Sequence, residues 1–274
     1  MVNGFSVFNA TCTGASHIRA GKPCQDFSTC LNMEKAAIIA IADGHGSDAY
    51  FRSDRGARFA AEAAIQCIQE LFTIHDEVFR ESLRQTPETV LETLEKSIIA
   101  AWHKKVADDL KQEAVDTDGF TAYGTTLLAT VMTENYWFAI QIGDGKCVII
   151  NEDNSVMQPV TWDERCFLNR TTSLCDDEAI CLFRHYYSET PPLAVFLGSD
   201  GIDDSFPVND NGKYLANFYM SVYRNFLDEG LEKGELQLRE ILPKITLKGS
   251  GDDVSVAGII RKFKSGADQN RTDA

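Results

Sequence analysis

Short apolar runs that border acidic, glycine-rich loops constrain this chain more than any other feature of its sequence. The first run, Ala36–Ala42, stops abruptly at Asp43-Gly44-His45-Gly46. Two further apolar runs are followed closely by an acid, and a fourth apolar run comes just after an acid. The four acids are Asp43, Asp144, Asp200 and Asp252. Apolar runs of this length, bounded by glycine and polar residues, are typical of buried strands.

Between these runs the apolar spacing changes to that of helices. Apolar residues recur every three or four positions from Ala61 to Phe72, which predicts a helix with one buried stripe. A second helix is predicted to open at Thr86-Pro87, where proline's missing N–H is tolerated. Two more are expected at about 213–227 and 231–242.

A period typical of strands returns at Leu127–Met132, Tyr136–Ile142, Cys147–Ile150 and finally Val254–Ile260. The short connection around Asp144 predicts a meander of antiparallel strands. Paired helices between groups of strands favour an α+β fold, a sandwich of two antiparallel β-sheets flanked by pairs of α-helices (α-β-β-α). We expect a single domain over 1–262 with a surface insertion around 155–192, and a polar C-terminal tail over 263–274.

The charge balance restricts the kinds of partner that the protein is expected to bind. Acidic residues outnumber basic ones by 41 to 26, so the formal net charge is −15, which argues against nucleic acid or an anionic membrane as the main partner. No apolar run approaches the roughly 18 residues of a membrane span, and the first residues lack a secretory signal. We therefore expect a cytoplasmic protein.

The eight cysteines contain no C-x-x-C pair, so zinc-ribbon and thioredoxin-type sites lack their signature. In a chain without a signal peptide they are expected to be reduced thiols. None has an arginine six residues downstream, which excludes the loop of the cysteine-nucleophile phosphatases.

The four acids are candidates for a divalent-cation site. If their strands belong to two packed sheets, the acidic loops can share one rim and bring the carboxylates into one cleft. Mg²⁺ and Mn²⁺ prefer oxygen ligands, and two such ions can activate a shared water. Alternatively, each Asp-Gly is an ordinary turn. Their recurrence at one topological position favours the metal site.

Longer motifs surround these acids in a fixed order. They are Asp43-Gly44-His45-Gly46, Gly124-Thr125-Thr126, Ile142-Gly143-Asp144-Gly145, Ser199-Asp200-Gly201-Ile202 and Asp252-Asp253-x-Ser255. Together they resemble the ordered motifs of the metal-dependent type 2C protein phosphatases, over about Phe5 to Ile260. The N-terminal string from Gly14 to Asp26 is similar to a bacterial branch of that family.

The resemblance implies a serine/threonine protein phosphatase that hydrolyses phosphoserine and phosphothreonine by direct attack of a metal-bridging water or hydroxide. It implies Mg²⁺ or Mn²⁺ as cofactor, with two ions and in many members a third. It also implies phosphorylated proteins as substrates, a cognate serine/threonine kinase as a partner, a signalling role, and a variable flap at the insertion.

Roles for the acids follow from the same resemblance. Asp43 would bridge two ions, and Gly44 would contribute its carbonyl. Asp200 and Asp252 would complete the coordination of the first ion. Asp144, with Asp200, would correspond to the weaker site for a third ion.

His45 would be the general acid that protonates the leaving alkoxide, because imidazole titrates near the working pH. Outside this motif it would more simply cap a turn. Thr125-Thr126 is expected to be a packed strand with hydroxyl hydrogen bonds, since no base is paired with it in the sequence.

Two departures from the family pattern concern the substrate phosphate and the second ion. Gly21 stands where many members have a phosphate-binding arginine, so Arg19, Lys22 and His17 are the nearby candidates.

Gln25 replaces an acid near the second ion, and Asp26 is given a supporting role. Asp204 matches a further acid of the family, or alternatively orients water or a loop. Asp253 stands where Asn is common and is expected to support the ligands.

A different class of function stays open at this point. The chain could be a catalytically weak or inactive phosphoprotein-binding regulatory domain of the same fold, as Gln25 and the missing arginine suggest. Hydrolysis at saturating Mn²⁺ discriminates the two, because a binding domain would hold a phosphopeptide without turnover.

Overall fold

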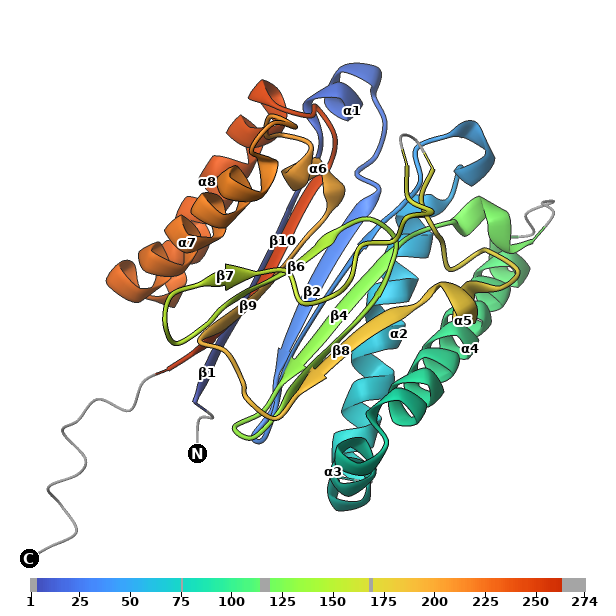
Figure 1. The fold of residues 1–274 in the computed structure, drawn as a ribbon. Helices are drawn as coiled ribbons and strands as arrows, with labels where there is room; N and C mark the ends of the chain where they lie inside the picture. Colours follow the sequence, from blue (N-terminus) through green and yellow to red (C-terminus); the bar gives the residue numbers. More distant parts are fainter. Residues whose placement is uncertain (1–3, 75, 114–118, 168–169, 263–274) are drawn as a thin grey trace, which may run out of the picture.

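Strands from both halves of the sequence pair in two five-stranded antiparallel sheets. The computed structural model describes residues 4–74, 76–113, 119–167 and 170–262 (Figure 1). The first sheet has the order β1 (Phe5–Cys12), β10 (Val254–Arg261), β9 (Ala194–Gly198), β6 (Lys146–Ile150), β7 (Val156–Met157). The second has the order β2 (Asp26–Asn32), β3 (Ala37–Asp43), β4 (Leu127–Met132), β5 (Trp137–Ile142), β8 (Arg184–Ser188).

Long helices cover the outer face of each sheet (Figure 1). Against the second sheet lie α2 (Ser53–Ile74), α3 (Asp76–Gln85) and α4 (Pro87–Glu113), and against the first lie α7 (Asn211–Glu229) and α8 (Leu231–Lys248). The short helices are α1 (Ala15–Ala20), η1 (Asp48–Tyr50), η2 (Phe120–Tyr123), α5 (Ala179–Leu182) and α6 (Asp200–Asp203). The predicted α-β-β-α sandwich is confirmed.

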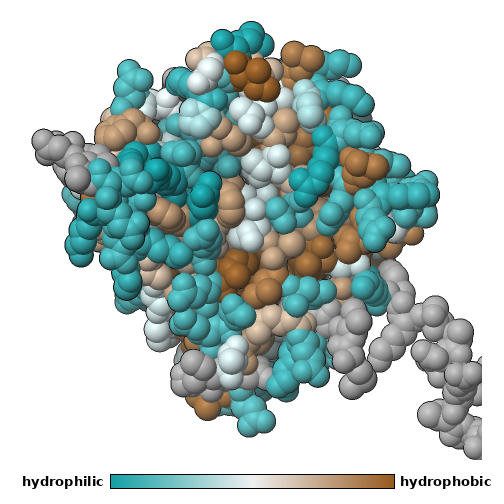
Figure 2. Space-filling view, turned by 180° about the vertical axis from the view of Figure 1, so that it is seen from behind, coloured by the Kyte–Doolittle hydropathy of each residue, from teal (hydrophilic) through white to brown (hydrophobic). Residues whose placement is uncertain are grey.

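Three apolar layers hold the sandwich together. Side chains such as Ile39, Leu128 and Ile259 fill the space between the two sheets, while Ile38 faces α2 and α4, and Phe196 faces α7 and α8. Strands buried on both faces need apolar residues at every position, which explains their continuous apolar runs. On the face opposite to that of Figure 1, hydrophilic residues gather on both flanks and less polar residues lie between them (Figure 2).

The connection at Asp144 differs from the expected hairpin. β5 lies in the second sheet and β6 in the first, so this turn crosses the sandwich. Gly143 has a φ of 103°, which favours glycine. The Gln141 side-chain amide donates to the Gly143 and Gly145 carbonyls at 3.2 and 2.7 Å, which satisfies the turn internally. The crossing places Asp144 at the rim shared by both sheets.

The insertion around 155–192 is less irregular than expected. Arg184–Ser188 forms β8, the edge strand of the second sheet, paired with β5, and Val156–Met157 pairs with β6. The sequence of β8 contains no apolar run, because its side chains are all half-buried. The predicted tail over 263–274 lies outside the described residues. None of the helices within the described ranges is both long and apolar enough to cross a membrane.

A cluster of charged side chains links β8 to α4. His185 Nδ1 lies 3.0 Å from Glu95 Oε1, and Nε2 contacts Glu88. Hydrogen bonds to Glu95 raise the pKa of His185 to about 9. Burial raises the pKa of Glu95 itself; because imidazolium is its direct partner, we expect both groups to be charged at neutral pH.

We expect His185→Gln to lower the free energy of unfolding by about 1–2 kcal/mol at pH 7, after allowance for solvent screening. Since the folded pKa lies above that of an unfolded histidine, about 6.5, the stabilisation is complete below that value and is lost as the pH rises through about 9. Urea unfolding at pH 6, 7 and 10 measures this. Lys96→Gln, which removes the exposed ion pair with Glu92 on the same helix, is the control. A deficit of His185→Gln that persists at pH 10 would contradict the assignment.

Candidate metal centre and active-site cleft

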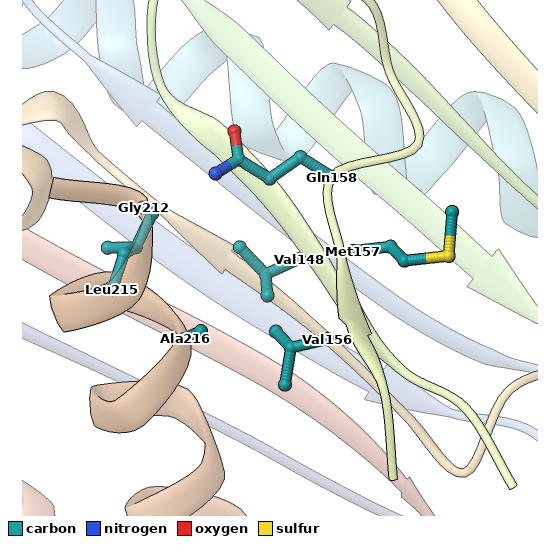
Figure 3. Close-up of a pocket in the computed structure, with 7 residues that line it drawn as sticks. All are labelled: Val148, Val156, Met157, Gln158, Gly212, Leu215 and Ala216. Atoms are coloured by element: carbon teal, nitrogen blue, oxygen red, sulfur yellow. The ribbon is translucent and has the colours of Figure 1, made fainter. Parts of the chain in front are cut away.

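The acidic loops meet at the end of the sandwich that carries α1 and α6 (Figure 1). They line a cleft of about 960 Å³. The predicted site residues that line it are His17, Gln25, Asp43, Gly44, His45, Asp144, Asp200, Asp204, Asp252 and Asp253. A separate hollow of about 260 Å³ between α7 and β6–β7 is lined by apolar residues and Gln158 (Figure 3). It offers no titratable group, so the chemistry belongs to the acidic cleft.

Asp43, the last residue of β3, is held by its backbone. Its N–H donates to Thr126 Oγ1 at 3.0 Å, and its carbonyl accepts from the Thr126 N–H at 2.8 Å and from Thr125 Oγ1 at 2.9 Å. The two threonines lie just before β4, with Thr125 in an isolated bridge to Gly44, and not within a strand as expected; their hydrogen bonds position the acid. At Gly44 a Cβ would approach the Ser53 and Gln25 carbonyl oxygens to 2.6 and 2.8 Å, so only glycine fits.

Like charges are concentrated beneath the cleft. Asp26 pairs with Asp43 across β2 and β3. Burial, followed by the Asp253 carboxylate, raises the pKa of Asp26 to about 8. Burial also raises the pKa of Asp200 to about 7. For Asp43, burial and the carboxylates of Asp26 and Asp200 raise the pKa well above its ordinary value. Without a cation, each negative charge here disfavours the others.

Several oxygen atoms in this cluster lack partners. Asp200 Oδ1 and Gln25 Oε1 are buried with no hydrogen bond among the described residues. Neither oxygen of Asp26 makes a hydrogen bond of good geometry to those residues, although the Ser199 and Ser255 hydroxyls lie close enough to favour its charged form. Buried acceptors are normally satisfied. An all-oxygen donor set with unsatisfied, mutually repelling carboxylates fits hard divalent cations.

Asp253 binds backbone groups. Its Oδ1 accepts from the Gly14 N–H at 2.6 Å, and its Oδ2 accepts from the Gln25 N–H at 2.6 Å. His17 lies 3.0 Å from Asp253 and 3.5 Å from the exposed Asp252. Asp253 thus joins the loops that carry α1 and β2 beside the cleft.

The two basic candidates near Gly21 lie outside the cleft. Arg19 is exposed and does not line it, whereas Lys22 is exposed and donates to the Gly46 carbonyl at 3.3 Å. The Gln25 side-chain amide donates to the His45 carbonyl at 3.0 Å and to Ser53 Oγ at 2.6 Å. Gln25 therefore tethers the loop that follows Asp43.

Sequence reasoning missed two arginines. Arg165 and Arg170, from the insertion, line the cleft. Arg165 Nε lies 2.8 Å from Asp163 Oδ1, and half of its side chain is exposed. No motif marks these residues, because the insertion has no periodicity from which a position could be predicted.

His45 lies in a less polar setting than expected. Its ring meets that of Tyr50 edge-on, with 4.7 Å between centroids. Burial lowers the pKa of His45 to about 4, below the near-neutral value expected from the sequence. The ring is neutral at pH 7 and retains one N–H as a donor.

On the other side of the cleft, burial raises the pKa of Asp144, while Lys146 and Arg184 oppose the shift. Arg184 also donates to the Gly143 carbonyl. Asp204 is exposed, and its N–H donates to the Asp200 carbonyl at 2.7 Å, which ends the short helix α6.

The sequence profile of the protein phosphatase 2C family matches residues 13–242, most of the chain. The chain belongs to the protein phosphatase 2C family. No curated protein sequence matches it significantly.

Solved structures share the fold at low sequence identity. The catalytic domain of the serine/threonine protein phosphatase PstP, in complex with two manganese ions, is 17% identical with a TM-score of 0.60, over 94% of this chain and 99% of that one. PppA, a regulatory component of the type VI secretion system in Pseudomonas aeruginosa, is 13% identical with a TM-score of 0.60, over 96% and 99%. A C. elegans sex-determining protein is 17% identical with a TM-score of 0.59, over 95% and 65%.

Because the buried acids of this cluster repel one another and no cation compensates them among the described residues, divalent ions should stabilise this protein. At 100 times Kd a ligand adds about 2.7 kcal/mol to the folded state, so we expect Mn²⁺ to raise Tm by roughly 5 °C or more. Thermal unfolding with Mn²⁺ and with EDTA tests this.

Asp43→Asn should reduce the shift, whereas Asp108→Asn, on the exposed surface of α4, should not. Equal Tm values of the unmodified protein in Mn²⁺ and EDTA would show that the cluster holds no ion.

Proposed function

We propose that this chain is a serine/threonine protein phosphatase whose divalent ions are held by the acids of the cleft. The observation that carries the proposal is the convergence of four remote acids in one cleft, with Asp200 Oδ1 buried and unpaired within the described structure. Membership of the protein phosphatase 2C family supports it. No observation favours the alternative of a binding domain without turnover.

Asp43 and the Gly44 carbonyl, with Asp200 and Asp252, form the main donor set, and Asp144 extends it toward β6. Two Mg²⁺ or Mn²⁺ ions would supply Lewis acidity and a reactive water at neutral pH when bound. Asp26 pairs with Asp43 across β2 and β3, and a bound cation would favour its charged form against the burial that raises its pKa. Asp253 orders the neighbouring loops through the backbone amides of Gly14 and Gln25.

His45 is the proton donor to the departing serine or threonine oxygen. Burial leaves the ring neutral at pH 7, and a phosphate dianion bound beside it would favour the imidazolium, the form that can give up a proton. An alkoxide is a poor leaving group, and general acid catalysis of this kind contributes typically 10² to 10⁴-fold. The carbonyl of His45 is fixed by the Gln25 amide and by Ser53 Oγ, which donates to it at 2.9 Å.

Arg165 and Arg170 supply the positive charge for the substrate phosphate, because Arg19 does not line the cleft and Lys22 is engaged at Gly46. An arginine fork suits phosphate oxygens. On this proposal the insertion around 155–192 acts as the flap that recognises substrate.

The wider setting is also proposed. Phosphorylated proteins as substrates, a cognate kinase and a signalling role follow from the phosphatase activity. A bacterial origin is proposed because the string from Gly14 to Asp26 is similar to a bacterial branch of the family, and a cytoplasmic location because the sequence has no apolar run long enough to span a membrane. The net charge of −15 disfavours nucleic acid and anionic membranes as partners.

Activity with Mn²⁺ tests the central proposal. We expect the purified protein to hydrolyse a phosphothreonine peptide with Mn²⁺, to lose activity in EDTA, and to lose roughly 10²-fold or more in Asp200→Asn. Release of phosphate is the measurement, and Asp153→Asn, an exposed turn acid, is the control. Turnover unchanged by both EDTA and Asp200→Asn would rule out a metal-dependent mechanism.

Substitution of Arg165 tests the phosphate site. Arg165→Gln should raise KM for a phosphothreonine peptide about tenfold and leave kcat nearly unchanged, as does the loss of an interaction made equally with the bound substrate and the transition state. Arg19→Gln is the matched control and should leave both constants as they are. If Arg165→Gln had the same KM as the unmodified protein, another residue would have to bind the phosphate.

A further inference from the structure

A lysine ammonium lies inside the acidic cluster. A smaller pocket of about 360 Å³ adjoins the main cleft and shares Asp144, Asp200 and Asp204 with it. Lys146, the first residue of β6, lines this smaller pocket but not the main cleft. Its charge is therefore directed at the acids and away from the space for substrate.

Several contacts hold Lys146 in place. Its Nζ lies 3.3 Å from Asp203 Oδ2 and donates to the Asp144 carbonyl at 3.3 Å. It also lies 3.7 Å from the centroid of the Trp162 ring, within the range of a cation–π interaction. The side chain is only 12% exposed, so this ammonium is a fixed part of the pocket.

We propose that Lys146 is a built-in counter-cation that competes with a third divalent ion for the Asp144 side of the cleft. The inference rests on the proposed metal centre. A unit positive charge within a few ångströms of the carboxylates repels an incoming cation strongly at the intermediate dielectric of a protein surface. Asp144, Asp203 and Asp204 are thus partly neutralised before any ion binds, unlike Asp26 and Asp43 at the other side.

Trp162 links the competition between Lys146 and a third ion to the insertion. A third ion near Asp144 would have to displace the ammonium from its contacts, which include the Trp162 ring. Trp162 belongs to the insertion and is 52% exposed, whereas Trp102 and Trp137 are almost completely buried. The fluorescence of Trp162 therefore reports on the position of Lys146.

Mn²⁺ titration by calorimetry tests the proposal. We expect the unmodified protein to bind two ions, with any third at least about tenfold weaker. Lys146→Met should tighten the third site by roughly tenfold or more, and Lys146→Arg, which keeps the charge, should restore the original pattern. Lys104→Met, on an exposed part of α4, controls for net charge.

The possible results separate the two proposals. An unmodified protein that binds no Mn²⁺ would refute the metal centre, and this inference with it. Two tight ions together with an unchanged third site in Lys146→Met, or three equally tight ions in the unmodified protein, would overturn only the role of Lys146.

A second measurement applies even if Lys146→Met fails to fold. In a Mg²⁺ titration of the unmodified protein, tryptophan emission should change during the weak phase, and Trp162→Phe should abolish that change. Emission that changes only with the tight ions, or no change at all as the weak phase proceeds, would overturn the proposal.

Discussion

Repulsion among partly buried carboxylates is the constraint on which the rest of this structure depends. Asp26, Asp43 and Asp200 all have raised pKa values, chiefly because burial disfavours their charged forms and neighbouring acids add to the effect. Such an arrangement lowers stability unless a cation offsets it. Its location at one rim of a well-packed sandwich indicates a function that requires concentrated negative charge, and divalent cations match its oxygen donors.

The sandwich makes this concentration possible because each acid stands where a buried strand meets the rim. Asp43 ends a strand of the second sheet, and Asp200 follows a strand of the first. Asp144 reaches the same place only because the turn between β5 and β6 changes sheets. Asp253 then joins the loop before β10 to the segments on either side of α1 through two backbone amides, so parts of the chain far apart in the sequence are held together beside the cleft.

Much of this arrangement could be predicted from the sequence. Apolar runs bounded by Asp-Gly identify both a buried strand and a loop at its end, so the sandwich and the meeting of Asp43, Asp144, Asp200 and Asp252 followed. The sheet change after Ile142 could not be predicted, since a hairpin has the same apolar pattern. β8 was missed because its half-buried residues show no apolar run. The low pKa of His45 reflects burial, and the arrival of Arg165 depends on an aperiodic insertion; neither has a local signal.

The insertion links the two kinds of charge in the cleft. It contributes Arg165 to the surface where a phosphate would lie, and Trp162 to the ring contact that fixes Lys146. A phosphate dianion and a third cation attract each other. Each would nevertheless lie near a positive charge on or beside the insertion: Arg165 would favour binding of the phosphate, and Lys146 would disfavour binding of the ion. Substitutions in the insertion should therefore alter substrate affinity and ion occupancy together, even where they leave Asp43 and Asp200 untouched.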